Sequence, residues 1–209
     1  MIIKMEDTKK ELNLRTMPEY YDLYITGDIE EQTLIDFRKS VLEKTKEVDD
    51  IIIEHVAILQ TMGIEKEEAK LRVPDFNIHI NTYGGSVYPG LGICDIITDL
   101  AKNFNVNIFC SGYIMSMGVP IILSGTKRFA YKNTTFMIHE ISGFGWGKLT
   151  EIKEDLKETE RLNNILKDII CKKSKVTKKE INEWYEKKRD VFLSTEEAKD
   201  YGLIDEIIE

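Results

Sequence analysis

The sequence has little cysteine, little histidine and no long apolar run, and each shortage excludes a class of protein. Its three cysteines, Cys94, Cys110 and Cys171, are far apart and odd in number. We therefore expect reduced thiols in a cytoplasmic protein instead of a disulfide framework. The three histidines show no spacing typical of a metal site, so neither a metal nor a cofactor is expected. No apolar stretch approaches the roughly 20 residues needed to cross a bilayer.

Positive charge is also in short supply. Lysine and arginine number 29 against 37 aspartates and glutamates, which gives a formal net charge of −8. This balance argues against nucleic acid or an anionic membrane as the main partner. The amino end lacks the apolar core and cleavage site of a signal peptide. The chain has 209 residues, 42% of them hydrophobic. It is expected to form one globular domain over residues 1–209, of which residues 1–18 form a polar, flexible arm at the amino end.

The segment 106–125 (VNIFCSGYIMSMGVPIILSG) organises the rest of the chain. Residues 106–110 are predicted to form a buried strand that ends at Gly112, and a buried helix is expected from about Met115. Ser116 is the one polar side chain of the apolar part and would lie near the amino end of that helix. There, free N–H groups and the helix dipole favour negative charge, which suits a nucleophile with an oxyanion-stabilising amide beside it. The alternative is a hydroxyl bonded to a carbonyl inside a core helix.

Predicted strands and helices alternate along the first half of the chain. Strands are expected at 22–26, 76–80 and 106–110, and helices at 30–49 and 88–102. This order predicts an α/β fold with right-handed crossovers and a mainly parallel sheet. The segment 51–73 interrupts it, and we expect one or two extra helices whose aliphatic face packs in the core or against another subunit.

The second half adds strands at 127–131 and 135–138 and a long amphipathic helix at 149–172. The apolar stripe of that helix repeats every three to four residues, which suits its own core or a neighbouring subunit. Two capping boxes, Thr177-x-x-Glu180 and Ser194-x-x-Glu197, predict the starts of two further helices. A last strand is expected at 203–208.

Three polar or glycine positions near predicted strand ends are candidates for chemistry. Gly84 and Gly85 follow a strand and permit a close approach of the backbone to a ligand, although a tight turn is the alternative. His139 ends a strand and is the histidine that could serve Ser116, whereas His79 is expected to be structural. Asp190 is expected in a loop between two helices, where a solvated role is the alternative.

Five motifs occur together in a fixed order: Gly84-Gly85, Ser116-Met117-Gly118, Met137-Ile138-His139, Arg189-Asp190-x-Phe192 and the tail at 196–205. In that order the chain resembles the ClpP family, the proteolytic subunits of the Clp protease, within the wider ClpP/crotonase fold. The resemblance covers about residues 20–50 and 76–208. It implies repeated β-β-α units, a mainly parallel sheet and a protruding handle helix within the region 140–173.

The resemblance also implies roles for individual residues. Ser116 matches the nucleophile, His139 the general base and Asp190 the residue that orients the base. The backbone N–H groups of Gly85 and Met117 match the oxyanion hole. The family holds its substrate as an added β-strand between two segments, here Gly84, Ser86, Val87 and Tyr88 on one side and Ser142, Gly143 and Phe144 on the other.

At the level of assembly, the resemblance implies polypeptide substrates and a homo-oligomer of stacked seven-membered rings that encloses the active sites. Arg189 matches a residue of the contacts that couple ring assembly to activity. An unfoldase ATPase of the AAA+ class is the partner that the family implies.

Several positions depart from the family pattern. Tyr83 stands at a usual proline, Glu140-Ile141 at a usual Gln-Pro, and Lys188 at a usual acidic residue. The insertion at 51–73 has no usual counterpart, and the arm does not resemble the loop that docks the ATPase. The protease chemistry therefore carries over better than the ATPase partnership, and a divergent cellular or phage-encoded member fits these differences.

Two alternatives stay open at this point. The first is a catalytically latent or inactive ring subunit, in which Asp190 or His139 would be misplaced. The second is a crotonase-type acyl-CoA enzyme, which would use oxyanion amides without a Ser–His–Asp set.

Overall fold

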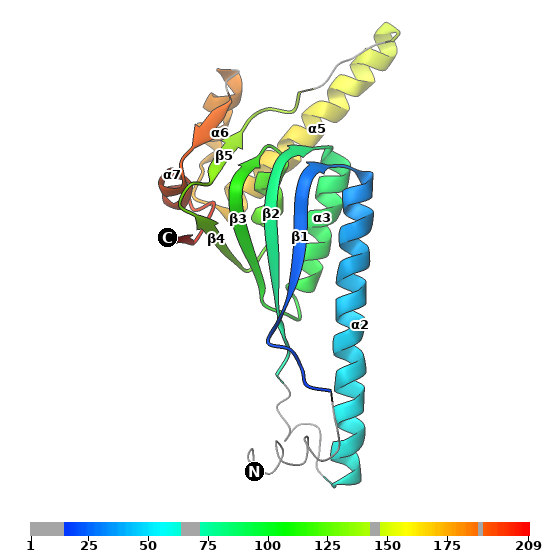
Figure 1. Ribbon diagram of the computed structural model, residues 1–209. Coiled ribbons are helices and arrows are strands. Elements are labelled where there is room, and N and C mark those ends of the chain that lie inside the picture. Colours follow the sequence, from blue (N-terminus) through cyan, green and yellow to red (C-terminus); the bar gives the residue numbers. More distant parts are fainter. Residues whose placement is uncertain (1–14, 64–71, 143–146, 188–189) are drawn as a thin grey trace.

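A parallel β-sheet organises the computed structural model, which describes residues 15–63, 72–142, 147–187 and 190–209. Within these ranges the strands form a seven-stranded sheet with the order β1-β2-β3-β4-β7, while β5 pairs with β3 and with β6 (Figure 1). All pairs are parallel except β5–β6. The predicted α/β class with a mainly parallel sheet is confirmed.

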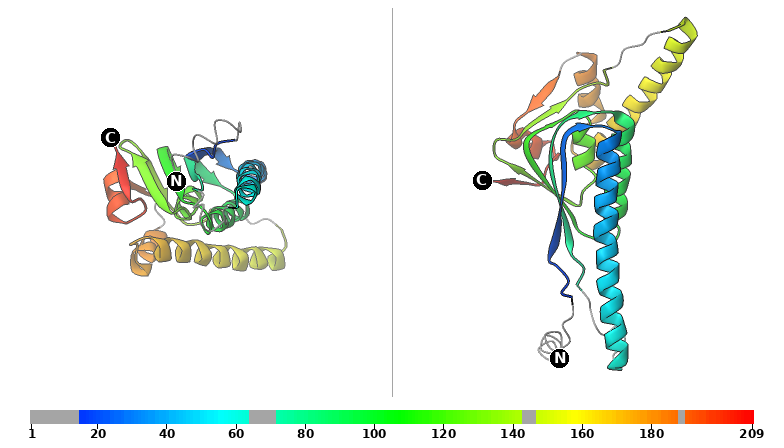
Figure 2. Two further views of the ribbon diagram at one scale, coloured as in Figure 1. Left: turned by 90° about the horizontal axis from the view of Figure 1, so that it is seen from below. Right: turned by 45° about the vertical axis from the view of Figure 1, so that its right-hand side comes forward.

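The first three strands carry the core of the sheet. They are β1 (Tyr20–Ile29), β2 (Asp75–Gly85) and β3 (Val106–Met115), and buried and exposed residues alternate along them. Leu23, Ile78 and Ile108 form one row across the sheet, and each is nearly inaccessible to solvent. Burial of each such side chain contributes roughly 1.5–3 kcal/mol. Helices α2 (Glu31–Thr61) and α3 (Val87–Leu100) cover one face of this sheet (Figure 2).

β3 continues through Gly112, so the expected strand end at that glycine is wrong. Ile80 pairs with Cys110 and Thr82 with Ile114, so β3 advances by four residues where β2 advances by two. Gly112 has a φ of +64°, which accommodates the bulge without ending the strand. The short helix α4 (Gly118–Ile122) begins after Ser116, later than expected.

Beyond the bulge β3 changes partner. Its first half pairs with β4 (Lys127–Tyr131) and its second half with β5 (Thr135–Ile138). Both strands have the bounds expected from the sequence. Because β3 changes partner, its carboxyl end lies beside the carboxyl end of β5 and not beside β4.

The carboxyl-terminal part contains one strand that the sequence pattern did not predict. β6 (Val191–Leu193) pairs antiparallel with β5, where a loop was expected. Around it lie α6 (Lys178–Glu186), α7 (Thr195–Asp200) and β7 (Glu206–Ile208). Both predicted capping boxes are present, since the hydroxyls of Thr177 and Ser194 accept hydrogen bonds from Glu180 N–H and Glu197 N–H.

α2 is longer than expected because residues 51–61 extend it instead of starting a separate helix. No glycine or proline interrupts residues 31–61, so the helix runs on past the sheet (Figure 1). His55 is buried on this extension, and its Nε2 lies 2.8 Å from the carbonyl oxygen of Arg15. The remainder of the predicted insertion, residues 64–71, lies outside the described residues, as does most of the predicted arm.

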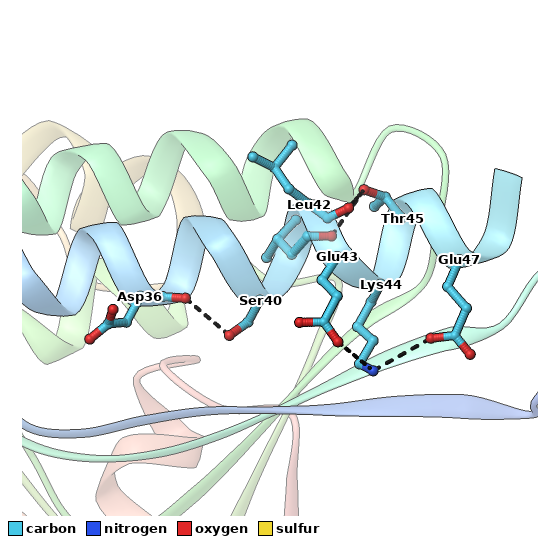
Figure 3. A network of polar contacts seen from close by, with 8 residues as sticks. Asp36, Ser40, Leu42, Glu43, Lys44, Thr45 and Glu47 are labelled. Atoms are coloured by element: carbon cyan, nitrogen blue, oxygen red, sulfur yellow. Dashed lines mark hydrogen bonds and ion pairs between the residues drawn. The ribbon is translucent and has the colours of Figure 1, made fainter. Parts of the chain in front are cut away.

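Side chains on the polar face of α2 form contacts with residues one to four positions away (Figure 3). Lys44 Nζ lies 3.3 Å from Glu43 Oε1 and 3.4 Å from Glu47 Oε2, and the hydrogen bond with Glu43 raises the pKa of Lys44. Such exposed contacts contribute little to stability, because solvent screens them. This face of α2 is therefore a solvated helix surface.

The long helix α5 (Leu149–Lys173) projects from the body at its amino end (Figures 1 and 2). The predicted apolar stripe divides between two environments. Leu162, Leu166 and Ile170 are buried against the body, whereas Leu149 and Leu156 are exposed. Only the carboxyl-terminal half of α5 therefore belongs to the core of the chain.

Arg128 of β4 ties the sheet to the carboxyl-terminal elements. Its guanidinium donates to both carboxylate oxygens of Asp205 at 3.0 and 2.7 Å. It also donates to the carbonyls of Lys173 and Gly202 at 3.1 and 3.0 Å. Burial by itself would raise the pKa of Asp205, but the hydrogen bonds from Arg128 outweigh it and hold this pKa below its usual value.

We expect Arg128→Met to lower the free energy of unfolding at pH 7 by about 2–4 kcal/mol, because Asp205 and two carbonyls lose their donor. Since the folded-state pKa of Asp205 is lowered, its stabilising effect is present above the unfolded pKa of about 3.9 and is lost as pH falls through the folded value. The variant should therefore lose less stability than wild type between pH 5 and pH 3. Urea unfolding at fixed chain concentration measures both quantities.

Lys127→Met is the matched control, since Lys127 forms an exposed ion pair with Glu206 at 2.6 Å. It should change the free energy of unfolding by less than about 1 kcal/mol. Equal acid sensitivity of Arg128→Met and wild type would contradict the role assigned to the Asp205 contact.

Candidate active site

Strand register brings Ser116, His139 and Asp190 together. Met115 at the end of β3 pairs with Met137 of β5, and the Ser116 N–H donates to the Met137 carbonyl at 2.8 Å. His139 follows the last residue of β5, so its ring lies beside the serine. Ile138 pairs antiparallel with Val191, and continuing this register places Asp190 opposite His139.

The three side chains meet at different distances. Ser116 Oγ lies 2.8 Å from His139 Nε2, which is an ordinary hydrogen-bond length. His139 Nδ1 lies 3.4 Å from Asp190 Oδ1, within ion-pair range but longer than an ordinary hydrogen bond. The His139 side chain is 25% exposed and that of Asp190 is 56% exposed. The serine and histidine are thus in contact, and the aspartate stands at the solvent side of the histidine.

Ser116 adopts a backbone conformation that few non-glycine residues take. Its φ is +51°, and within the described ranges no other non-glycine residue has a positive φ. Such a conformation costs on the order of 1–3 kcal/mol and persists only where the surroundings enforce it. The sharp turn between β3 and α4 presents the hydroxyl to the cavity. Strain at a residue of this kind is a feature of functional sites.

Gly84 of β2 packs directly against this turn. A Cβ added to Gly84 would lie 2.7 Å from Ser116 Cβ and 3.0 Å from Met117 N, and Gly84 has a φ of +98°. The absence of a side chain lets the two backbones approach. The paired glycines are therefore a close approach between strands and not merely a turn.

Two further residues of the cavity can offer a backbone amide to the site. Gly85 and Met117 both line the cavity that contains Ser116. The Met117 N–H donates no backbone hydrogen bond within the part of the chain that the structure describes. An amide in this position can stabilise negative charge that develops on a carbonyl oxygen bound next to Ser116.

The cavity has a volume of about 400 Å³ and is lined by both polar and apolar residues. Its floor and walls include Val87, Pro120, Ile138, Leu166, Ile170 and Tyr185. Burial raises the pKa of the Tyr185 hydroxyl, so this group is neutral at physiological pH. The cavity can therefore hold an uncharged side chain next to the reactive hydroxyl.

The sequence model of the Clp protease family matches residues 30–209. The chain belongs to the Clp protease family. Membership supports a peptidase activity in general, and the mixed α/β fold with its mainly parallel sheet agrees with the fold of this family.

The predicted substrate-binding segments of this family member line the cavity in part. Ser86, Val87 and Ser142 line it, next to Gly85. Tyr88 points elsewhere, since its hydroxyl donates to Glu158 Oε1 of α5 at 2.5 Å. The predicted site residues Gly143 and Phe144 and the predicted oligomerisation residue Arg189 lie outside the described residues.

The sequence prediction missed the residues that shape the cavity. Pro120, Leu166, Ile170 and Tyr185 come from α4, α5 and α6. Leu166 and Ile170 were visible as part of the apolar stripe of α5. Their position at the cavity depends on how α5 docks on the body, which the periodicity of one helix does not contain.

Neither a metal site nor a membrane span is found within the described residues. Among the described residues, no group of three or more His, Cys, Asp or Glu side chains is arranged to hold a metal ion. No helix in the same ranges is both long and apolar enough to cross a membrane.

Proposed function

We propose that this Clp protease family member is a serine endopeptidase that cleaves unfolded polypeptides or peptides by Ser–His–Asp acyl transfer. The observation that carries the proposal is the 2.8 Å contact between Ser116 Oγ and His139 Nε2, made by a serine at a positive φ. A buried structural serine would need neither the histidine nor the unusual backbone conformation.

The mechanism follows from the positions of these groups. Ser116 Oγ attacks the substrate carbonyl carbon while His139 Nε2 takes the hydroxyl proton, and the resulting oxyanion accepts hydrogen bonds from the N–H groups of Gly85 and Met117. His139 then gives the proton to the leaving amine, which leaves an acyl-enzyme on Ser116. Water, deprotonated by His139, releases the acid product. Asp190, next to His139 Nδ1, steadies the imidazolium in both halves.

The substrate class follows from the cavity. Its apolar wall, with Ile138, Leu166 and Ile170, suits an apolar side chain on the residue that provides the scissile carbonyl. Ser86 and Ser142, one from each expected substrate-binding segment, both line the cavity, which supports binding of an extended peptide as an added strand.

The proposed assembly is a homo-oligomer of stacked heptameric rings in the cytoplasm, which acts with or without an AAA+ unfoldase. The exposed apolar side chains Leu149, Ile152 and Leu156 on the projecting half of α5 support contacts with another copy. The chemistry on the chain's own residues needs no cofactor.

A catalytically latent ring subunit is the second candidate. The observation in its favour is the 3.4 Å separation of His139 Nδ1 and Asp190 Oδ1, with the Asp190 side chain 56% exposed. In an active member this distance shortens on substrate binding, as catalytic hydrogen bonds commonly do.

The test is incubation of the purified, assembled protein with a reduced and alkylated polypeptide of known sequence, followed by mass spectrometry of the fragments. We expect internal cleavages after apolar residues by wild type and none by Ser116→Ala. An uncut polypeptide with intact wild-type rings would support the latent subunit. Trimming from the chain ends alone would contradict an endopeptidase.

A further inference from the structure

Asn163 is a buried polar residue of α5 that contacts the segment next to His139. Its side chain is almost fully enclosed, since the residue is only 7% exposed. Asn163 Oδ1 accepts a hydrogen bond from the Ile141 N–H at 3.0 Å, and Asn163 Nδ2 donates to Glu140 Oε1 at 3.3 Å. One side chain thus holds two consecutive residues that follow His139 directly in the chain.

These two contacts fix a segment that has no strand partner among the residues that the structure describes. β5 ends at Ile138, so residues 139–141 leave the sheet and are not held by its ladder. Ile141 lines the cavity with His139, and an unpaired Ile141 N–H at this half-buried position would be costly. The hydrogen bonds with Asn163 hold residues 140 and 141 as pairing with a neighbouring strand holds Ile138.

The hydrogen bonds of Asn163 connect residues 140 and 141 to the projecting helix α5. Leu166 and Ile170, one and two turns after Asn163 on α5, line the same cavity. The amino half of α5 extends away from the body (Figure 1). A displacement of α5 would therefore move residues 140–141 and, through the backbone, the His139 ring.

We propose that Asn163 is a positioning residue that holds His139 against Ser116 by fixing Glu140 and Ile141, and so links the placement of α5 to acyl transfer. This inference rests on the proposed serine peptidase function. Asn163 is not among the residues that line the cavity, so it would act through residues 140 and 141.

A small fluorophosphonate measures the alignment directly, because it reacts with an activated serine without occupying the peptide-binding segments. Asn163→Ala should lower its rate of reaction with Ser116 by about 10- to 100-fold, the effect expected when a reacting group is misplaced by up to about 1 Å. Asn164→Ala is the matched control, since Asn164 is the next residue of α5 and is exposed. It should react at the wild-type rate.

Exchanging the donor and the acceptor between residues 163 and 140 tests whether Asn163 acts through its hydrogen bonds or only through packing. Asn163→Asp keeps an acceptor for the Ile141 N–H but places a carboxylate against that of Glu140, so the reaction should slow. Adding Glu140→Gln supplies an amide donor to the new carboxylate and should restore the rate to within about threefold of wild type, as a coupled pair does in a double-mutant cycle. Glu140→Gln alone keeps a carbonyl oxygen for Asn163 Nδ2 and should have little effect.

The outcomes distinguish this inference from the function on which it rests. Unreactive wild type would overturn the proposed function itself. Reactive wild type with a normal rate in Asn163→Ala, or with no recovery in the double variant, would overturn the positioning role. A lower melting temperature at an unchanged rate would show that Asn163 only packs. If Asn163→Ala does not fold, the Asn163→Asp and Glu140→Gln pair, which preserves volume and both contacts, carries the test.

Discussion

Replacing His139 by alanine is expected to lower kcat/KM for peptide hydrolysis by about 10⁴- to 10⁶-fold. His139 Nε2 lies 2.8 Å from Ser116 Oγ, and without this base the hydroxyl must lose its proton to water. Removal of one member of a cooperating serine–histidine pair costs about as much as removal of both. A fluorogenic peptide assay on assembled protein measures the loss.

His79→Ala is the matched control for this prediction. His79 lies on the outer face of the sheet, stacked between Tyr24 and Phe109, and its Nε2 is 2.9 Å from Asp22 Oδ1. With ring assembly verified, we expect its kcat/KM to stay within about threefold of wild type, the ordinary range for a change away from the reacting groups. Comparable activity of His139→Ala and His79→Ala would mean that His139 is not the base.

Gly84→Ala is expected to reduce the reaction of Ser116 with a fluorophosphonate by at least about 100-fold. The added methyl group would meet Ser116 Cβ at 2.7 Å and the Met115 carbonyl oxygen at 2.8 Å. Because these are β3 backbone atoms and the first atom of a side chain, the serine turn itself must shift. Alanine also resists the φ of +98° at this position.

Gly27→Ala separates the two causes. Gly27 has a φ of +78° with nothing within 4 Å of an added Cβ, so it carries the backbone strain without the collision. We expect Gly27→Ala to lower the free energy of unfolding by about 1–2 kcal/mol while the labelling rate stays near wild type. Equal losses of labelling in the two variants would show that the close approach of Gly84 to Ser116 does not matter.

Local signals in the sequence predicted the elements that depend on few residues. The capping boxes at Thr177 and Ser194 are complete within four residues, and both start helices in the structure. The strands 127–131 and 135–138 are bounded by polar residues and have the expected limits. The parallel sheet followed from the order of strands and helices alone.

The wrong predictions of secondary structure concern segments whose structure depends on residues far away in the sequence. Gly112 was expected to end a strand, but β2 on one side and β5 on the other hold β3 together beyond the bulge. β6 has only three residues, too few for a pattern, and exists because β5 offers it a partner. The α2 extension was expected to break, although its sequence contains no breaker.

The candidate site shows the same division. Ser116, His139 and Asp190 could be singled out from the sequence because each follows or precedes an apolar strand or carries a family motif. Their relative positions could not be predicted, because these depend on the register of the β3–β5 and β5–β6 pairings. Asn163 was not singled out, since a single asparagine in a long helix gives no sign of the backbone that it contacts.

Intact mass after treatment with a fluorophosphonate, on wild type and Ser116→Ala in parallel, is the most direct measurement of whether Ser116 is an activated nucleophile. The contact with His139 and the amides of Gly85 and Met117 predict one adduct per wild-type chain and none on the variant. An adduct retained by Ser116→Ala, or no adduct on fully assembled wild type, would contradict the assignment of Ser116 as the nucleophile of an active peptidase.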